Sequence, residues 1–525
     1  MAGQTSEGTD GKALGVTLTM LAGVFHRLYT EIGLQAWLAA PRDTKILCLQ
    51  RYFRFFAYGG STLILVLYLS SLDISKQKIG LFMTLTLLGD VLISLVLTVV
   101  ADRVGRRPML AVGAFLMAVS GIVFALSDNF WVLLLASVVG VISPRYSTIA
   151  ALTSPRSCPL IASSGNEIGP FKAIEESIIS HLTPSVERSA ILAWYFIAGS
   201  TGAACGNIVF GWVVELLQVK HSWSPLESYR LVFWAYALFG LLKCSLVFML
   251  SNRCELEEKV VSPPRGPSQT SVDEASPLLR DGEESTAKHD GSNSAATRFK
   301  FSARNLLPNI SRETRGILLK LCLLFAMDSV ASGLAPVSWM NYFFNLKFNL
   351  PEGQLGSLFF VASILSSLSN LAAPALARRI GLIKTMVFTH VPASLALAAI
   401  PLPSNSALAM TLLLFRASTN SMDQAPRQAF LAAAVLPSER TAVMGVVNVV
   451  KTLSQSVGPV ITGILVNRHL FGLAFVLAGS LKILYDIFML VMFLGYRTVE
   501  ERAADSTSTQ NESDPGVEAN GAQVA

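Results

Sequence analysis

The feature that most constrains this chain is a series of apolar segments, each long enough to cross a lipid bilayer. An α-helix rises about 1.5 Å per residue, so about 20 apolar residues cross the ~30 Å hydrocarbon core. The first half holds six such segments, at about 53–71, 78–100, 109–127, 130–182 with an interruption, 190–214 and 231–250. Six more follow at about 315–341, 354–376, 384–402, 406–435, 442–466 and 472–495. We therefore expect an all-α membrane protein with twelve transmembrane helices in two pseudo-symmetric six-helix bundles.

Composition argues against a water-soluble fold. Hydrophobic residues make up 52% of the 525-residue chain and charged residues only 14%, whereas soluble domains carry roughly 25% charged residues. The formal charge is +6, but Lys and Arg lie in short segments between apolar runs instead of one basic patch, which argues against a nucleic-acid partner. Cysteines and histidines show no metal-ligand spacing, so we expect no metal and no other cofactor.

Polar segments divide the chain into five parts. Residues 1–50 form a cytoplasmic N-terminal segment whose apolar stretch favours an amphipathic helix in the membrane interface over a thirteenth span. Residues 51–250 form the first bundle and residues 315–496 the second. Between them, residues 251–314 are rich in Ser, Pro, Gly and charges, which predicts a disordered linker. Residues 497–525 form a disordered cytoplasmic tail.

The distribution of positive charge predicts the orientation, because Lys and Arg beside spans are retained on the cytoplasmic side. Such residues stand beside the second, sixth, seventh and eighth spans, as with Arg103, Arg253, Arg312 and Arg378. The connections between spans 3 and 4 and between spans 9 and 10 have none. We therefore expect both termini and the linker in the cytoplasm.

An internal repeat supports the two-bundle plan. The sequence PSVERSA before the fifth span echoes PSERTA before the eleventh, and 18 residues separate both Arg188 from Gly206 and Arg440 from Gly458. Two superposable halves are the simplest explanation. Folds of this kind place the substrate between the halves, near the midplane of the membrane.

The same comparison shows an anomaly in the fourth span. Its counterpart, the tenth span, is expected to run without interruption through Arg416 and Asp423. The fourth span instead stops at Pro144 and is followed by an insertion at 145–163, and removing those 19 residues restores a span of matching length. The insertion is either an extra loop or a retained intron, and sequencing the transcript would distinguish the two.

The loop after the second span resembles the loop signature of the major facilitator superfamily, G-x-x-x-D-R-x-G-R-R. Its residues are Asp102, Arg103, Gly105, Arg106 and Arg107, and the resemblance implies that they form a latch on the cytoplasmic side. An aspartate there accepts hydrogen bonds from a neighbouring helix N-terminus and an arginine. Thr98 stands where the leading glycine would be, and the corresponding loop of the second half lacks the acid, so its latch is expected to be weaker. The alternative is a loop that is positive only for topology.

Longer strings, including SGNEIGPF and MDQAPRQAFLAAAVLPSERTAV, look like a poorly characterised branch of this superfamily shared by fungi and bacteria. The resemblance covers roughly 51–500 outside the linker, and it implies a fold that alternates access to a central site. The fifth span lacks the Gly-Pro pair of the antiporter signature of drug exporters, which argues against drug antiport.

Charged residues inside the spans are the candidates for substrate or proton binding, since each costs about 2.5–3.5 kcal/mol at a helix centre unless it faces a cavity or a partner. The candidates are Arg54, Asp90, Glu167, Asp328, Arg416, Asp423 and Arg427. Glu167 and Asp423 each stand three residues before a proline, which would direct two carboxylates into the space between the halves. The alternative is that they only neutralise Lys172 and Arg427 in structural ion pairs.

Other charges are expected to have structural roles. Arg54 also lies close enough to the end of its predicted span to reach the interface with its guanidinium group. One helical set is expected at the cytoplasmic surface as solvated pairs: Lys172, Glu175 and Glu176. Three charges of the last two spans are expected to form packing pairs: Lys451, Lys482 and Asp486.

The function that these features predict is secondary transport of a small organic solute by alternating access, coupled to protons. No nucleotide-binding loop of the G-x-x-x-x-G-K-[ST] kind occurs, which argues against a pump, and no catalytic pairing indicates an enzyme. The alternatives are an uncoupled facilitator and a non-transporting membrane sensor on the same fold. The expected partners are the solute, protons and the lipid bilayer, and we expect a monomer.

The linker carries a short pattern that resembles an acidic dileucine sorting signal, formed by Glu274, Leu278 and Leu279. Adaptor proteins read such signals in eukaryotes. If the pattern is functional, it directs the protein to vacuolar or endosomal membranes, and the alternative location is the plasma membrane.

Overall fold

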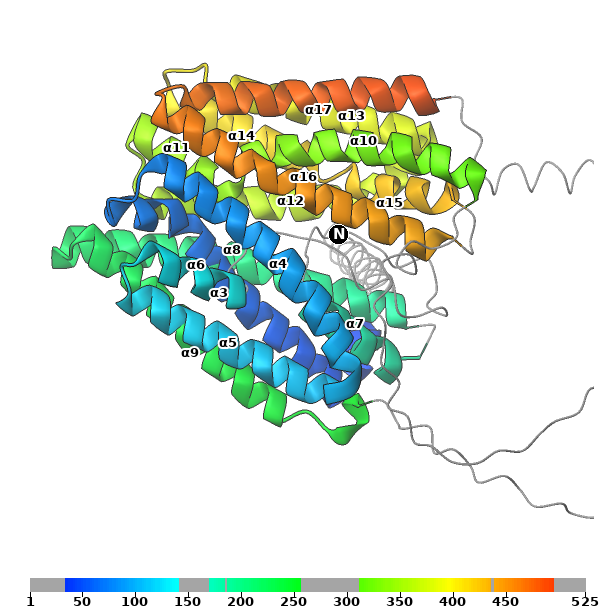
Figure 1. Ribbon diagram of the computed structural model, residues 1–525, viewed down its shortest axis with the longest axis horizontal. Helices are drawn as coiled ribbons and strands as arrows, with labels where there is room; N and C mark the ends of the chain where they lie inside the picture. The colour runs from blue at the N-terminus through cyan, green and yellow to red at the C-terminus, as the bar shows by residue number, and fades with distance from the viewer. Residues whose placement is uncertain (1–33, 141–169, 185–186, 256–310, 436–438, 495–525) are drawn as a thin grey trace, which may run out of the picture.

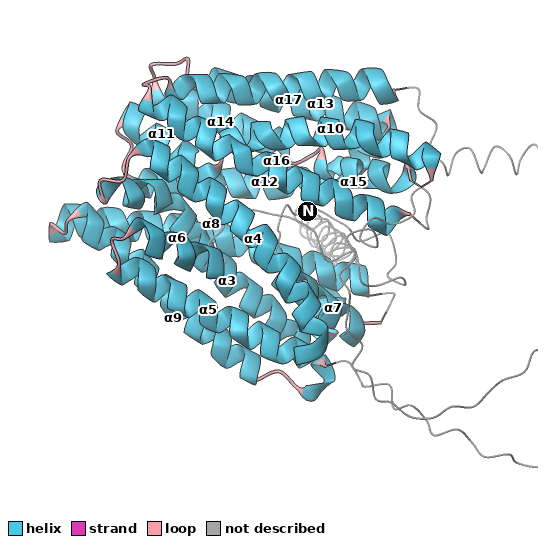
Figure 2. Cartoon of the chain, in the orientation of Figure 1, coloured by secondary structure: helices cyan, strands magenta, loops and turns pink. Residues whose placement is uncertain are grey.

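The computed structural model describes residues 34–140, 170–184, 187–255, 311–435 and 439–494. Within these ranges the chain forms helices and no β-strand (Figures 1 and 2). The predicted all-α fold is therefore confirmed.

Each half of the chain supplies one bundle. The first bundle consists of α3 (Arg42–Ser71), α4 (Lys76–Val104), α5 (Arg106–Leu126), α6 (Phe130–Val139), α7 (Pro170–Leu182), α8 (Arg188–His221) and α9 (Pro225–Phe248), with a short α2 (Leu34–Ala39) before it and a 3-10 turn η2 (Asn252–Cys254) after it. The second consists of α10 (Arg312–Leu334), α11 (Val337–Phe348), α12 (Glu352–Ile380), α13 (Leu382–Ala399), α14 (Ser406–Asn420), α15 (Gln424–Ala433), α16 (Arg440–Asn467) and α17 (Phe471–Phe493).

The twelve predicted spans correspond to these helices. By length and hydropathy alone, eight helices of the described chain qualify as spans, with α10 and α11 taken together, and α12 makes a ninth although it is bent by 42°. The second span is α4. The fourth and tenth spans are each built from two shorter helices, α6 with α7 and α14 with α15.

Prolines explain two of the breaks. The tenth span is interrupted between Asn420 and Gln424, so the prediction of an uninterrupted tenth span is wrong. Pro426 has no N–H to donate to the carbonyl of Met422, and its ring conflicts sterically with that carbonyl. In the seventh span, Pro336 separates α10 from α11 in the same way. The inserted segment at 145–163 lies outside the described residues.

Asparagine caps begin two other helices, at equivalent places in the two halves. The side chain of Asn129 accepts a hydrogen bond from the backbone N–H of Trp131 at 2.9 Å, which caps α6. Asn405 caps α14 through the N–H of Ala407 at 2.8 Å. Unsatisfied N–H groups of a first turn favour such acceptors.

Two glycines turn the chain sharply at one end of the bundles. Gly105 has a φ of +97° between α4 and α5, and Gly381 has a φ of +89° between α12 and α13. Only glycine adopts such angles without strain. We call this end, at which α9 leaves the first bundle and α10 begins the second, the linker end. The far end is the one at which α3 ends at Ser71.

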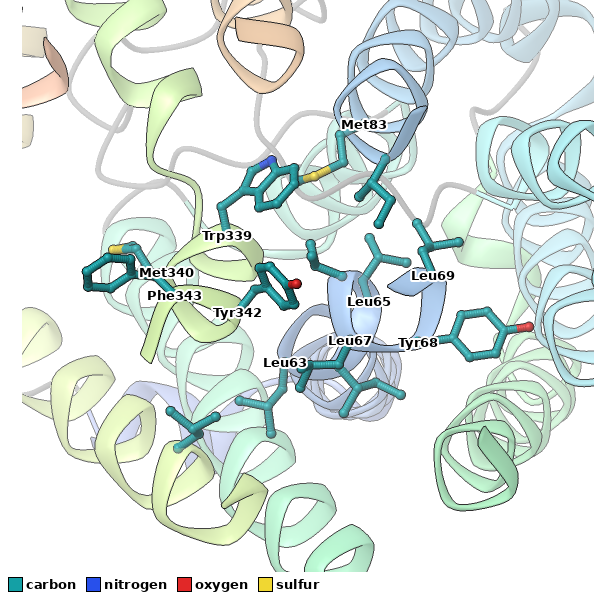
Figure 3. Packing of buried hydrophobic residues seen from close by; sticks show 14 of the residues in the cluster. Leu63, Leu65, Leu67, Tyr68, Leu69, Met83, Trp339, Met340, Tyr342 and Phe343 are labelled. Atoms are coloured by element: carbon teal, nitrogen blue, oxygen red, sulfur yellow. The ribbon is translucent and has the colours of Figure 1, made fainter. Parts of the chain in front are cut away.

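The two bundles share one apolar core at the far end and have separate cores at the linker end. The shared cluster includes Leu65 of α3, Met83 of α4 and Trp339 of α11, and Figure 3 shows Trp339 beside Met83. A second cluster lies only in the first bundle and a third only in the second. The ribbons accordingly meet at the far end and diverge toward α7 and α15 at the linker end (Figure 1).

Glycines of α8 and α16 show how the halves repeat each other. A Cβ on Gly206 would lie 2.0 Å from the carbonyl oxygen of Phe56 in α3, and a Cβ on Gly458 would lie 2.1 Å from the carbonyl carbon of Gly333 in α10. The fifth span of each half therefore packs backbone to backbone on the first span. The predicted repeat corresponds to equivalent packing.

The same two helices also contact the opposite bundle at close range. A Cβ on Gly211 of α8 would lie 3.0 Å from the Cα of Gly356 in α12, and a Cβ on Gly463 of α16 would lie 2.9 Å from the Cα of Gly80 in α4. We call these two places the glycine crossings. Both lie in the half of the molecule toward the far end.

Candidate substrate and proton site

The loop of the motif turns at Gly105, between α4 and α5. The carboxylate of Glu255, which follows η2, accepts hydrogen bonds from the backbone N–H of Arg106 at 2.8 Å and of Arg107 at 2.9 Å. A negative group at a helix N-terminus is stabilised by the helix dipole. The side chains of Asp102 and Arg103 lie outside the described residues, so their role as a latch stays a prediction. What the structure adds is a second acid, Glu255, at the start of α5.

A buried ion cluster lies within the first bundle. Glu175 of α7 is fully buried, and its carboxylate lies 3.2 Å from Nη2 of Arg54 in α3 and 3.4 Å from Nζ of Lys243 in α9. The hydroxyl of Tyr195 in α8 donates a hydrogen bond to the same carboxylate. Four helices thus meet at one acid.

Arg51 belongs to the same neighbourhood. Its guanidinium carbon lies 4.1 Å from the centre of the Tyr195 ring, a distance typical of a cation–π contact. The Nε atom of Arg51 would lie 2.6 Å from a Cβ at position 199, so Gly199 leaves room for the arginine beside α8.

A second ion cluster lies within the second bundle. Asp328 of α10 pairs with Nη1 of Arg427 at 2.8 Å and with Nζ of Lys482 at 2.6 Å. Arg427 also pairs with Asp423 at the start of α15, and Lys482 bonds to the hydroxyl of Ser332 at 2.8 Å. The break before α15 places Asp423 and Arg427 on one face, since residues four apart on a helix are neighbours.

An imidazole–carboxylate pair adjoins this cluster. Nδ1 of His390 in α13 lies 2.9 Å and 3.0 Å from the two carboxylate oxygens of Asp486 in α17, and both residues are buried. His390 faces the same cavity as Asp328 and Asp423.

The second cluster borders a cavity of about 60 Å³. That volume holds a few water molecules. The cavity is lined by charged and amide or hydroxyl side chains, namely Asp328, Ser329, Ser332, His390, Asn420, Asp423, Gln424, Arg427, Lys451, Gln455 and Lys482. Such a set can bind a polar solute and exchange protons with it.

The two clusters are related by the internal repeat. Lys243 follows Gly240 by three residues in α9, and Lys482 follows Gly479 by three residues in α17. Gly240 lies against Ala118 of α5, whereas Gly479 lies against the equivalent helix α13. Each bundle therefore directs a lysine of its sixth span at a buried acid.

Several predicted site residues come together. Asp328, Asp423 and Arg427 form one network, and Asp423 with Arg427 is the ion pair that was the alternative to a binding role. Arg416 of α14 lies in the electrostatic neighbourhood of Lys482. Arg54 is at the edge of the other network.

Asp90 stands apart from both clusters. It is buried in α4, and neither carboxylate oxygen has a hydrogen-bond partner among the described residues. Glu167, the partner proposed for Asp423, lies outside the described residues, as do Glu274, Leu278 and Leu279.

Two expectations are wrong. Arg54 does not snorkel, because α3 begins at Arg42 and places Arg54 deep enough to pair with Glu175. Glu175 is not solvated at the surface but fully buried among cations. Lys482 forms an ion pair as expected, with Asp328, and it also lines the cavity.

Sequence reasoning did not identify Lys243 and His390. The repeated spacing of a glycine and a lysine in the sixth and twelfth spans would have indicated Lys243. His390 gives no comparable pattern, since its partner Asp486 is far away in the sequence. Among the described residues, no group of three or more His, Cys, Asp or Glu side chains is arranged to hold a metal.

Comparison with known proteins identifies similar chains. A family model described as Major Facilitator Superfamily matches residues 47–156, 168–422 and 321–518. An uncharacterised membrane protein of Saccharomyces cerevisiae, YJR124C, is 35% identical over 467 residues, which cover 87% of this chain and 95% of the yeast protein.

Solved structures share the fold at low sequence identity. A bacterial homolog of the human lysosomal transporter Spinster, in an inward-facing and occupied conformation, has a TM-score of 0.60 and 14% identity, over 86% of this chain and 96% of that one. A D-xylose-proton symporter has a TM-score of 0.58 and 12% identity, over 85% and 96% of the two chains. Identities this low carry the fold alone.

Proposed function

This chain belongs to the major facilitator superfamily, and from that premise we propose that it moves a small organic solute across a membrane by alternating access, driven by protons. The membership and the fold make the chain a multi-pass membrane transporter and not an enzyme. The nature of the solute and the coupling to protons are the proposed part.

One observation supports the coupling above others: the acids beside the cavity share a single arginine. Arg427 pairs with both Asp328 and Asp423. A proton on Asp423 removes its charge and hence its attraction for the guanidinium group. Arg427 is then held by Asp328 alone and can turn toward a solute in the cavity, so proton uptake and solute binding become linked.

The shape of the molecule supports alternating access. The bundles share an apolar core only at the far end, which corresponds to a state open toward the linker end. Positive loops predict that the linker end is cytoplasmic, so we propose that this state faces inward. Location in the plasma membrane or in a vacuolar or endosomal membrane is part of the same proposal, as are Glu167 as a second carboxylate and the latch at Asp102.

The test is solute movement by purified protein in liposomes. Uptake of a broad solute panel is measured under an imposed pH gradient for the wild type, for Asp423→Asn and for Glu167→Gln. Asp128→Asn is the matched control, because Asp128 is an exposed far-end acid paired with Arg230. We expect gradient-driven accumulation to be lost in Asp423→Asn and retained in Asp128→Asn.

A second measurement separates coupling from folding. Exchange of labelled solute at equal pH requires binding and alternation but no net proton movement, so Asp423→Asn should retain it. Accumulation by Asp423→Asn at the wild-type level would contradict a proton role for Asp423. Wild-type flux that ignores the pH gradient would identify an uncoupled facilitator, and a protein that binds a solute but moves none would be a sensor.

A further inference from the structure

The acids that line the cavity already have partners. Asp328 lies between Arg427 and Lys482, at 2.8 Å and 2.6 Å. Asp423 pairs with Arg427. A cationic solute would have to displace the arginine and lysine side chains that already pair with these acids. Binding of a cation is therefore disfavoured.

Lys451 of α16 is the exception among the cations. It lines the cavity and is half-buried, yet within the part of the chain that the structure describes it forms neither a salt bridge nor a hydrogen bond. Its ammonium group lies 5.8 Å from the ring centre of Phe325. An ammonium group is strongly hydrated and has three donors, so at this place it requires acceptors from the contents of the cavity.

The charges around the cavity add to this argument. The lining contains two aspartates, Asp328 and Asp423, against three cations, Arg427, Lys451 and Lys482. Counted over these aspartate, arginine and lysine side chains, the lining carries one more positive than negative charge, and one anionic group neutralises that excess.

We propose that the solute carries an anionic group, a carboxylate or a phosphate, which binds between the ammonium group of Lys451 and the guanidinium group of Arg427. The amide side chains of Asn420 and Gln455, which also line the cavity, bind neighbouring polar atoms of the solute. This inference rests on the proposed function and names the class of solute for the same site. Arginine presents paired donors that match a carboxylate or phosphate, and lysine adds a point charge.

The experiment uses probes that share a carbon frame and differ in charge. Gluconate, glucose and glucosamine form one set, and benzoate, benzyl alcohol and benzylamine form another. Binding is measured as a shift in the thermal unfolding temperature of the purified full-length protein, and transport as exchange in liposomes. The variants are Lys451→Gln, Lys451→Arg and the matched control Lys384→Gln, which removes an exposed lysine of the same bundle.

We expect an acid of at least one set to bind and its neutral and basic counterparts not to bind. Since a hydrogen bond to a charged group is worth about a factor of 10 to 100 in affinity, Lys451→Gln should raise the Kd of the acid by about that factor. Lys451→Arg should restore binding in large part, and Lys384→Gln should bind like the wild type.

Other results would overturn the inference and leave the proposed function separately testable. Transport of neutral or basic probes that Lys451→Gln does not change would exclude the anion site while transport stands. An unfolding shift from phosphatidylglycerol and from no soluble acid would assign the anion to a lipid headgroup and exclude an anionic solute. Absence of flux for every probe in the wild type would instead count against the proposed transport function.

Discussion

At the scale of single residues, Gly458 shows how closely two helices approach. A Cβ at this position would lie 2.1 Å from the carbonyl carbon of Gly333 and 2.4 Å from its Cα. Both atoms belong to backbone, so no side chain can turn aside. We expect Gly458→Val to separate α16 from α10 and to lower the free energy of unfolding by about 1–3 kcal/mol, as overpacking does.

Thermal unfolding of the purified protein in detergent checks this expectation. Gly316→Ala is the control, because a Cβ on Gly316 of α10 meets nothing within 4 Å. In a helix interior that change should stabilise the protein by about 0.5–1 kcal/mol. Equal unfolding temperatures for Gly458→Val and the wild type would mean that the close approach is not needed.

Cys254 offers a test on a residue outside the spans. It is fully buried in η2, and burial, followed by the nearby Asp43 carboxylate, raises the pKa of its thiol to about 11. The reactive thiolate fraction at pH 7.5 is then roughly one in three thousand. We expect a variant that retains only Cys254 to resist a maleimide until it unfolds, and to react faster as the pH rises toward the pKa.

The control places a thiol one residue away. Arg253 is exposed, so Arg253→Cys combined with Cys254→Ser should react rapidly at pH 7.5. Equal labelling rates for the two folded proteins would contradict the burial of η2 against α3 and α5.

The charged residues show how much of the candidate site could be predicted from the sequence. Asp328, Asp423 and Arg427 were predicted as site residues because charge inside a span requires a cavity or a partner. Lys243 was missed and Glu175 was assigned to the surface, since neither burial nor the partner across the bundle is visible in the local sequence. The contact between His390 and Asp486 joins residues 96 positions apart, and no local pattern encodes it.

At the scale of helices, the N-terminus of α12 is held by the opposite bundle. The carboxylate of Glu215 in α8 accepts a hydrogen bond from the backbone N–H of Gly353 at 2.9 Å. The hydroxyl of Tyr229 in α9 donates to Glu352 at 2.7 Å. We expect Glu215→Ala to shift the equilibrium toward far-end opening by about tenfold or more, since a hydrogen bond to a charged group is worth about 1.5–3 kcal/mol.

The reporter for far-end opening is Asn207→Cys, at a position that is buried against Gly356 in this state. A membrane-impermeant thiol reagent added from the far side should label this cysteine faster in the presence of Glu215→Ala. Glu215→Gln is the matched control, because its amide oxygen still accepts the bond. Equal labelling rates with the native Glu215, with Glu215→Ala and with Glu215→Gln would show that Glu215 does not hold the far end closed.

The helices themselves were largely predictable. Apolar length located the spans, and the repeated asparagines and glycines fixed equivalent ends, as Asn129 and Asn405 show. The first span was placed too short because its polar beginning from Arg42 is covered by α7, α8 and η2. The break near Asp423 does not follow from apolar length, because it depends on the local effect of Pro426 on the helix.

At the scale of the whole molecule, the sequence repeat predicts two equal halves but not the angle between them. Equal halves can close at either end, and two such packings differ by a small free energy. The observed choice depends on many apolar contacts around Trp339 and Leu65 at the far end. No single motif carries that information.

The glycine crossings have a consequence for how the bundles can move. Two fixed points of contact define a line, and a rigid body joined to another at two points can only turn about that line, as a door turns on two hinges. Gly80 with Gly463 and Gly211 with Gly356 leave the bundles one degree of freedom while both contacts last. Turning about this axis narrows the linker end and breaks neither contact. The linker end can therefore close over a bound solute while both glycine crossings stay in contact.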